Sequence, residues 1–157
     1  MFRSILPAAI VALAGLLPQH SAAQAQACRN TMDENNCVRV LACVGAQGVV
    51  FDGHAYGWEQ GVVKGLLSSG VPCGGQWSAN GPMGTGFAQM QCGDGVTGEV
   101  IYFKQDSLTG TAIGGGKTSR GEAIRIWSGR NVLEYLRREG GRERAILPCE
   151  SGDIPVS

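Results

Sequence analysis

The stretch from residue 86 to residue 103 reads GFAQMQCGDGVTGEVIYF. Alternating apolar and polar side chains run into Gly93-Asp94-Gly95 and out again, which is typical of a β-hairpin whose three-residue loop ends in a glycine of positive φ. Such a loop pairs Met90 with Gly98 and places Ala88 opposite Val100. The sequence therefore predicts a two-stranded ribbon with one apolar face and one polar face.

Similar loops recur along the chain at a nearly constant interval. Each closes on glycine and is flanked by short runs rich in Val, Ile, Ala or aromatic residues: Ala46-Gln47-Gly48, Ser68-Ser69-Gly70, Gly93-Asp94-Gly95 and Ser119-Arg120-Gly121. The closing glycines are 22, 25 and 26 residues apart. This spacing predicts a mainly β, single-domain antiparallel meander of about four glycine-rich hairpins.

The same three-residue loops predict that glycine repeatedly faces a larger residue on the partner strand. The predicted pairs are Leu41 with Gly53, Gly65 with Cys73, Met90 with Gly98, and Gly114 with Ile126. Glycine inside a strand marks a tight bend or a close approach of two backbones. We therefore expect a strongly curved sheet or a small barrel.

The second unit has an alternative interpretation. Trp58, Val62, Val63, Leu66 and Leu67 also fit one face of a helix that stops at Gly70. Two internal glycines weigh against this helix, at about 1 kcal/mol each relative to alanine. The hairpin is the preferred interpretation.

The cysteines test the strand order. If Cys73 bonds to Cys92, the second and third hairpins pair so that Gly75 meets Met90 and Trp77 meets Ala88, which uses the faces that the separate hairpins already require. Cys28 with Cys37 and Cys43 with Cys149 would then tie both termini to the sheet. Pairing of Cys37 with Cys149 remains an alternative.

After Trp127 the pattern changes to a helical period. Ser128 is a candidate N-cap for a helix with apolar positions Val132, Leu133 and Leu136, and Gly140-Gly141 follows as a stop. The sequence therefore predicts one C-terminal helix, followed by a short apolar run into Cys149.

The N-terminus has the three parts of a secretory signal. A charged start is followed by the apolar run from Ile5 to Leu17 and by small residues with Ala-x-Ala spacing, so cleavage after Ala25 or Ala27 is expected. We expect residues 1–27 to be the signal and residues 28–157 to be one disulfide-bonded β domain. Six cysteines behind such a signal indicate a periplasmic or extracellular location. A retained anchor helix is the alternative.

The composition excludes several functions. The chain has 13 basic and 13 acidic residues, which argues against a nucleic-acid-binding protein. Gly114-Gly115-Gly116-Lys117-Thr118 resembles a phosphate loop, but the first glycine of that motif is replaced by Thr111 and a strand is expected to follow. No metal site or cofactor is predicted, because the cysteines are accounted for as disulfides and only His54 follows the expected signal.

One pair of residues suggests catalysis. Asp52 and His54 lie two positions apart and would share one face of a strand, where the carboxylate could orient the imidazole for general-base chemistry. No activated nucleophile accompanies them. A small hydrolase is therefore an alternative, and a non-enzymatic protein is expected.

Candidate binding residues fall into two groups. Arg130, Arg137 and Arg138 lie on or before the predicted helix and could meet an anionic partner, although nearby glutamates dilute the charge. Tyr56 and Trp58 could line a groove for carbohydrate or peptide, whereas Trp77 and Trp127 are expected in the core. The expected function is a non-catalytic exported module that binds a protein or an envelope polysaccharide.

A resemblance supplies a third possibility. Met90-Gln91-Cys92-Gly93-Asp94-Gly95, Ser128-Gly129 before Tyr135, and Ala145-Ile146-Leu147-Pro148-Cys149 resemble segments of the small periplasmic inhibitors of C-type lysozymes. Those inhibitors are β-barrels that insert a Ser-Gly loop into the lysozyme active site. The resemblance implies an inhibitor of a cell-wall hydrolase, with Ser128-Gly129 as the inserted pair.

Overall fold

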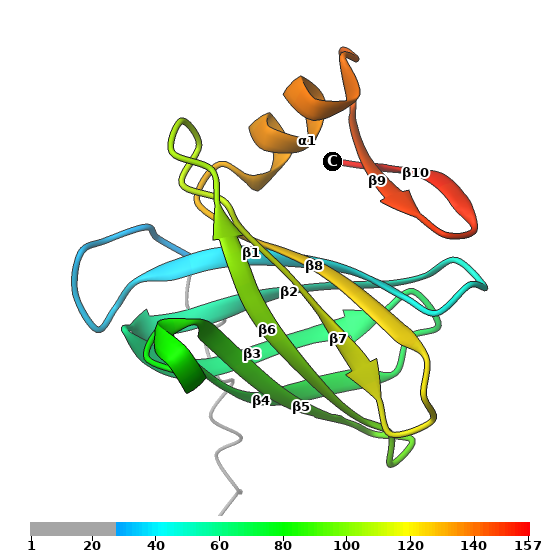
Figure 1. Ribbon diagram of the computed structural model, residues 1–157, viewed down its shortest axis with the longest axis horizontal. Coiled ribbons are helices and arrows are strands. Elements are labelled where there is room, and N and C mark those ends of the chain that lie inside the picture. The colour runs from blue at the N-terminus through cyan, green and yellow to red at the C-terminus, as the bar shows by residue number, and fades with distance from the viewer. Residues whose placement is uncertain (1–27) are drawn as a thin grey trace, which may run out of the picture.

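A closed antiparallel barrel forms most of the molecule. The computed structural model describes residues 28–157 (Figure 1), so the expected signal of residues 1–27 lies outside the described part. Each of the eight strands pairs with its neighbours in sequence, and the last pairs with the first. The strands are β1 (Cys37–Val44), β2 (Val49–Trp58), β3 (Gln60–Leu67), β4 (Pro72–Ser78), β5 (Gly86–Cys92), β6 (Thr97–Gln105), β7 (Ala112–Thr118) and β8 (Ala123–Gly129). The structure therefore confirms the mainly β fold and resolves the curved sheet into a small barrel.

Three of the four predicted loops have the expected form. Gly70, Gly95 and Gly121 close three-residue loops with φ of +85°, +81° and +82°, a backbone conformation that favours glycine. The strands leave these loops in the predicted register, with Gly65 opposite Cys73, Met90 opposite Gly98, and Gly114 opposite Ile126. The rival helix over residues 58–67 is wrong, because these residues form parts of β2 and β3.

The first hairpin differs from the prediction by one residue. Its turn contains four residues and begins and ends on glycines of positive φ, Gly45 and Gly48. Val40 therefore faces Gly53, and the predicted pair of Leu41 with Gly53 is wrong. A shift of one residue moves a side chain to the other face of a sheet, so Leu41 points out of the barrel.

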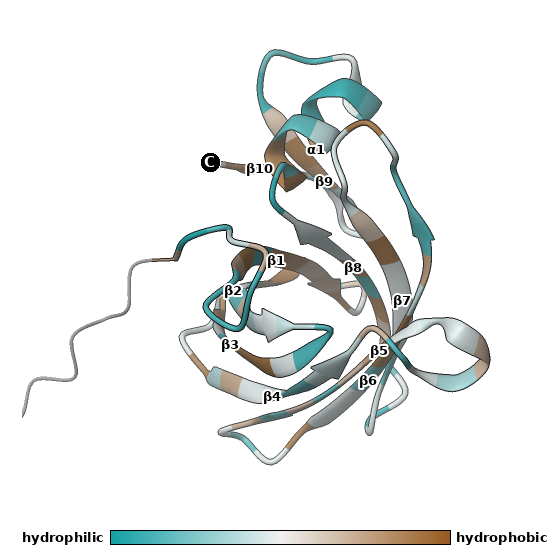
Figure 2. Cartoon of the chain, turned by 90° about the vertical axis from the view of Figure 1, so that its left-hand side faces the viewer, coloured by the Kyte–Doolittle hydropathy of each residue, from teal (hydrophilic) through white to brown (hydrophobic). Residues whose placement is uncertain are grey.

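A second hydrophobic core lies outside the barrel wall. Helix α1 (Val132–Gly140) and the hairpin of β9 (Ala145–Cys149) and β10 (Gly152–Val156) pack beside β1 and β8. Figure 2 shows this C-terminal unit above the barrel. It covers apolar side chains on the outer face of the wall: Leu41, Cys43 and Trp127 pack with Val132, Tyr135, Leu136, Ala145 and Leu147. No helix in residues 28–157 is long and apolar enough to cross a membrane.

The helix begins later than the sequence suggests. Asn131 occupies the N-cap position, and Ser128 belongs to β8, so the predicted cap is wrong. Ile124, Ile126 and Ser128 alternate as the inward residues of β8. The strand therefore includes Ser128, although the helical sequence pattern begins directly after Trp127. The predicted stop is confirmed, because Gly141 is left-handed at φ +58° and donates its N–H to the last turn.

Three disulfides tie the structure together. Cys73 pairs with Cys92, and these two residues lie directly opposite each other on β4 and β5, as the register argument predicts. The other bonds are Cys28–Cys37 and Cys43–Cys149, so the alternative of Cys37 with Cys149 is wrong. Three disulfides and no free cysteine among residues 28–157 are typical of an oxidising, extracellular-type environment.

Candidate ligand site in the barrel lumen

The barrel is hollow and opens at both ends. Residues of alternate positions point inward from all eight strands and surround two cavities of about 480 Å³ and about 270 Å³. The two cavities share Ala88, Met90 and Ile126, which form the waist of the lumen. We call the end with the larger cavity the tyrosine end, after Tyr102, and the other the disulfide end, after Cys73–Cys92.

Small inward residues keep the lumen open. Side chains of an eight-stranded barrel are usually just large enough to fill its interior. Here several of the residues that line the two cavities are alanine or glycine: Ala42, Ala55, Ala88, Gly98 and Ala112. At Gly65 a Cβ atom would lie 2.6 Å from the Cα of Gly53 and 2.6 Å from the ring of Phe51, so the wall also bends sharply there.

Apolar side chains line most of the tyrosine end. Its walls include Val38, Val63, Trp77 and Met90. The indole of Trp77 crosses β3 at Gly61, where a Cβ atom would collide with the carbonyl oxygen of Tyr56. Trp77 Nε1 donates to that carbonyl oxygen at 2.9 Å. The ring is therefore held in place with its polar atom satisfied and an apolar surface left for the cavity.

Tyr102 and Ser128 supply a polar pair in this apolar end. Both residues line the larger cavity, where the Ser128 hydroxyl lies close enough to the Tyr102 hydroxyl to affect its pKa. Burial raises the pKa of Tyr102 above its usual value, and the Ser128 hydroxyl opposes this effect only in part. Tyr102 is therefore neutral at physiological pH, and the pair can donate or accept a hydrogen bond without introducing charge.

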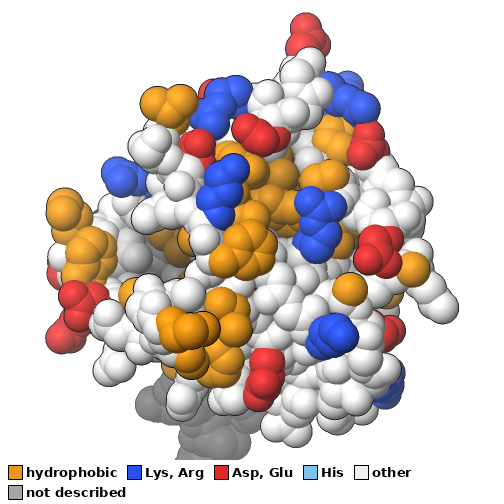
Figure 3. Space-filling model, viewed as in Figure 1, with side chains coloured by type: hydrophobic (Ala, Val, Ile, Leu, Met, Phe, Trp, Pro, Cys, Tyr) orange, Lys and Arg blue, Asp and Glu red, His pale blue; other side chains and the backbone are white. Residues whose placement is uncertain are grey.

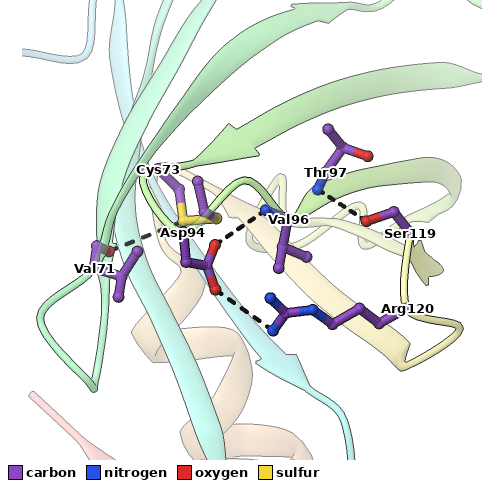
Figure 4. The surroundings of a disulfide bond; sticks show 8 residues. Val71, Cys73, Asp94, Val96, Thr97, Ser119 and Arg120 are labelled. Carbon is purple, nitrogen blue, oxygen red and sulfur yellow. Dashed lines mark hydrogen bonds and ion pairs between the residues drawn. A yellow bond between two sulfur atoms is a disulfide. The ribbon is translucent and has the colours of Figure 1, made fainter.

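Charged residues and the disulfide shape the opposite end. Cys73–Cys92 lines the smaller cavity, and Arg120 Nη1 lies 3.6 Å from Asp94 Oδ2 across two neighbouring loops (Figure 4). The backbone N–H of Thr97 donates to Ser119 Oγ at 3.2 Å. These contacts join the β5–β6 and β7–β8 loops beside the opening.

The lumen suits an uncharged ligand. Charged residues that line the two cavities are Lys104 at one end and Asp94, Arg120 and Glu122 at the other. They belong to loops or to the ends of strands, and the waist is formed by apolar side chains. An ionised group in the middle of the lumen would lose its hydration without finding a counter-charge. Small-molecule sites combine such an apolar lining with a few polar groups, in volumes of about 300–1,000 Å³.

Asp52 and His54 lie on the outer face of β2 and not in the lumen. Arg39 holds the Asp52 carboxylate through two nitrogen atoms, at 3.0 Å and 2.6 Å, and also donates to the carbonyl oxygen of Ser157. Among the described residues, no hydrogen bond joins Asp52 to His54. The His54 ring instead lies 6.3 Å from the ring of Tyr56. The carboxylate of this pair is therefore engaged by an arginine.

The predicted arginines do not converge on one site. Arg137 pairs with Glu134 at 2.8 Å within α1, and Arg138 pairs with Asp106 at 2.8 Å between α1 and the β6–β7 connection. Arg130 is exposed between β8 and α1. Two of the three charges are thus matched by an acid.

The two predicted aromatic residues lie near each other in sequence but differ in surroundings. Tyr56 is half-buried on the outer face of β2, and Trp58 is exposed at the β2–β3 turn. Neither lines the lumen cavities. The glycine-rich segment from Gly114 to Thr118 belongs to β7, so its backbone is a strand and not a phosphate loop.

Sequence reasoning missed the lumen as a site. The alternation that predicts apolar ribbon faces does place Ala88 and Met90 on one apolar face, which turns inward in the barrel. It does not show whether the enclosed space is filled, because this depends on how far the barrel closes. In residues 28–157, no group of three or more His, Cys, Asp or Glu side chains is placed to hold a metal ion.

Comparisons with known proteins give no family. No protein-family model matches the sequence, and no curated protein matches it. Two designed proteins have similar folds. A de novo designed fluorescence-activating β-barrel is 18% identical with a TM-score of 0.48, over 60% of this chain and 91% of the design. The redesigned barrel mFAP0, bound to DFHBI, is 16% identical with a TM-score of 0.47, over 62% of this chain and 98% of the design. Similarity at this level carries no argument about function.

Proposed function

We propose that this protein is an exported, non-catalytic binding protein that holds one small, uncharged, mainly apolar molecule in the barrel lumen. The observation that carries the proposal is the cavity of about 480 Å³ at the tyrosine end, with apolar walls and the Tyr102–Ser128 pair. An eight-stranded barrel is large enough to hold one small ligand when its interior is not filled. Export is supported by the expected signal and by the three disulfides.

A small molecule fits this structure better than the macromolecular partner expected from the sequence. A macromolecular partner would require a continuous exposed surface. Arg137 and Arg138 instead pair with different acids, and the cavity of about 480 Å³ with apolar walls is internal. The hydrolase-inhibitor alternative depends on Ser128-Gly129 reaching into an enzyme. Ser128 faces the lumen, and a Cβ atom at Gly129 would lie 2.9 Å from the carbonyl oxygen of Gly110, so the geometry does not favour a protruding pair.

Titration with a neutral apolar dye tests the proposal. Nile red fluorescence should rise on addition of the protein and saturate at one dye per barrel. Ala88→Phe places a ring at the waist and should weaken dye binding at least about tenfold, because filling the lumen removes the space and the apolar contact area. Gln89→Phe is the matched control. The side chain of residue 89 points out of the barrel, so this substitution should leave dye binding unchanged.

A second variant protects the test against misfolding. Met90→Trp starts from a residue that is only partly buried, so the larger ring has room to enter the cavity. Far-ultraviolet circular dichroism shows whether each variant folds. Equal dye binding by wild type, Ala88→Phe and Met90→Trp would show that the lumen is not the site.

A further inference from the structure

The connections of the barrel divide between its two ends. In an up-and-down barrel, successive turns alternate between ends, so the segment before β1 and the β2–β3, β4–β5 and β6–β7 connections lie together at the tyrosine end. The other four connections lie at the disulfide end. Figure 2 looks toward the tyrosine end.

Large apolar side chains are concentrated at only one of these ends. The segment before β1 and the three strand connections at the tyrosine end each carry one of them: Met32, Trp58, Met83 and Leu108, with exposed fractions of 85%, 44%, 96% and 79%. We call these four residues the apolar rim. Phe103 adds a fifth exposed side chain near the end of β6. The fifth segment at this end, from β8 into α1, exposes Arg130. In Figure 3, hydrophobic side chains are visible at the left-hand edge, where several of these connections lie in Figure 1, and also over the middle of the face.

The loops at the disulfide end are polar by comparison. Their central residues are Ala46-Gln47, Ser68-Ser69, Asp94 and Arg120. Of the remaining large exposed apolar residues, Val62 and Ile101 lie within strands, and Leu66 lies one residue before the end of β3 at the disulfide end. The disulfide end therefore has one large exposed apolar residue, whereas the tyrosine end has five.

The conformation of Met83 shows that this placement has a cost. Met83 has a backbone φ of +56°, in the left-handed region that residues other than glycine rarely adopt. Its turn is held by a hydrogen bond from Thr85 Oγ1 to the carbonyl oxygen of Pro82, at 2.7 Å. A glycine would relieve the backbone without loss of packing, because the side chain is almost fully exposed. Strain retained for an exposed apolar side chain points to a functional role.

We propose that the apolar rim inserts into the surface of a lipid bilayer and seats the tyrosine end of the barrel against it. Four apolar tips around an opening can enter the headgroup region while the polar backbone between them stays hydrated. A protein partner would instead need one continuous, close-packed patch. The larger cavity opens inside the rim, so an apolar molecule could pass between bilayer and lumen without crossing water.

The charges near the rim indicate an uncharged lipid surface. Charges of both signs lie near the rim: the acids are Asp33, Glu34 and Glu59, the bases are Arg29, Lys104 and Arg130, and Asp106 is paired with Arg138. These charges balance, so the rim has no net attraction for anionic headgroups. The surface that the rim binds is therefore a bilayer of zwitterionic lipids. Docking does not depend on the ligand proposed for the lumen.

Flotation with phosphatidylcholine vesicles tests the rim, using the form of the protein purified after export. The triple variant Met32→Ser, Met83→Gly, Leu108→Ser should lower the partition coefficient at least about tenfold, because three apolar side chains no longer leave water. Leu66→Thr with Ile101→Thr is the matched control on the barrel wall and should bind vesicles like wild type. Trp58 emission should shift to shorter wavelength when vesicles are added, and this shift should disappear in Trp58→Phe.

The outcomes separate this inference from the proposed function. The rim variant should bind Nile red normally in the absence of vesicles, whereas Met90→Trp should lose the dye and still float. Equal flotation of wild type and rim variant would overturn the proposal. So would binding that requires anionic lipid and is lost in the double variant Arg137→Glu, Arg138→Glu. A wild-type dimer that becomes monomeric in the rim variant would show that the rim is a protein interface instead.

Discussion

Arg138 Nη2 lies 2.8 Å from Asp106 Oδ1, and this ion pair connects α1 to the β6–β7 connection across 32 residues of sequence. Thr109 also donates to the Asp106 carboxylate, from its hydroxyl at 2.7 Å and from its backbone N–H at 2.8 Å. The two hydrogen bonds from Thr109, followed by the Arg138 contact, lower the pKa of Asp106 to about 2. One carboxylate thus fixes a loop of the barrel and the helix beside it.

The lowered pKa of Asp106 predicts a loss of stability in acid. A carboxylate whose pKa is depressed on folding stabilises the folded state above its unfolded pKa, near 3.8, and loses this contribution as the pH falls toward about 2. Urea unfolding between pH 4 and pH 2 should therefore show a falling free energy of unfolding. Asp106→Asn should flatten that dependence. Glu134→Gln, which removes an exposed ion pair, is the control and should retain the wild-type slope.

Alkaline titration should reveal Tyr102. Burial raises its pKa, so tyrosinate absorbance should include a component that appears well above pH 10 while the barrel is folded. The folded state favours the neutral phenol, and stability from this source is present below pH 10 and declines above it. Tyr102→Phe should reduce the late component. Burial raises the pKa of Tyr135 as well, so the control is Tyr56→Phe on the outer face of β2, and a late component of unchanged size in Tyr102→Phe would contradict the assignment.

The glycine pair at the bend of β2 and β3 should not tolerate alanine. In Gly65→Ala the new methyl group would meet the Cα of Gly53 and the ring of Phe51, both at 2.6 Å. Overpacking of this kind costs about 1–3 kcal/mol. Gly74→Ala is the matched control, because its methyl group would point outward and lie 3.5 Å or more from its neighbours. Chemical denaturation should show a clear loss of stability for Gly65→Ala and little for Gly74→Ala.

The disulfides should differ in what they stabilise. Cys43–Cys149 spans 106 residues and Cys73–Cys92 spans 19, so replacing the first pair by alanine should cost about 1.5 kcal/mol more by loop entropy. Loss of the first pair also frees β9 from β1. Trp127 should then become accessible to acrylamide before the barrel unfolds. A larger loss of stability from the double variant Cys73→Ala, Cys92→Ala would contradict the expectation.

Local patterns predict much of the strand pairing. The pairs Met90–Gly98 and Gly65–Cys73 follow from three-residue loops that end in glycine, because a loop of known length and a side-chain period of two leave one register. The bond between Cys73 and Cys92 follows from the same two properties. These features depend only on residues that are neighbours in a hairpin or in adjacent hairpins.

Features that depend on contacts between residues distant in sequence could not be predicted in this way. The pairing of β8 with β1 and the burial of Leu41 beneath α1 need the whole wall in place, and the four-residue first turn decides which face Leu41 occupies. Ser128 is a helix cap by local sequence and a lumen residue in the structure, because closure of the barrel extends β8 by hydrogen bonds to β1.

By itself, therefore, the sequence determined the register of three barrel hairpins, the curvature and the disulfide between neighbouring strands, since short-range sterics and period-two alternation decide them. Only the tertiary structure decided that the barrel closes, that its interior stays open, and that the apolar loop tips gather around one opening. The physical reason is that the enclosed volume and the rim depend on the positions of all eight strands, which no single segment of sequence specifies.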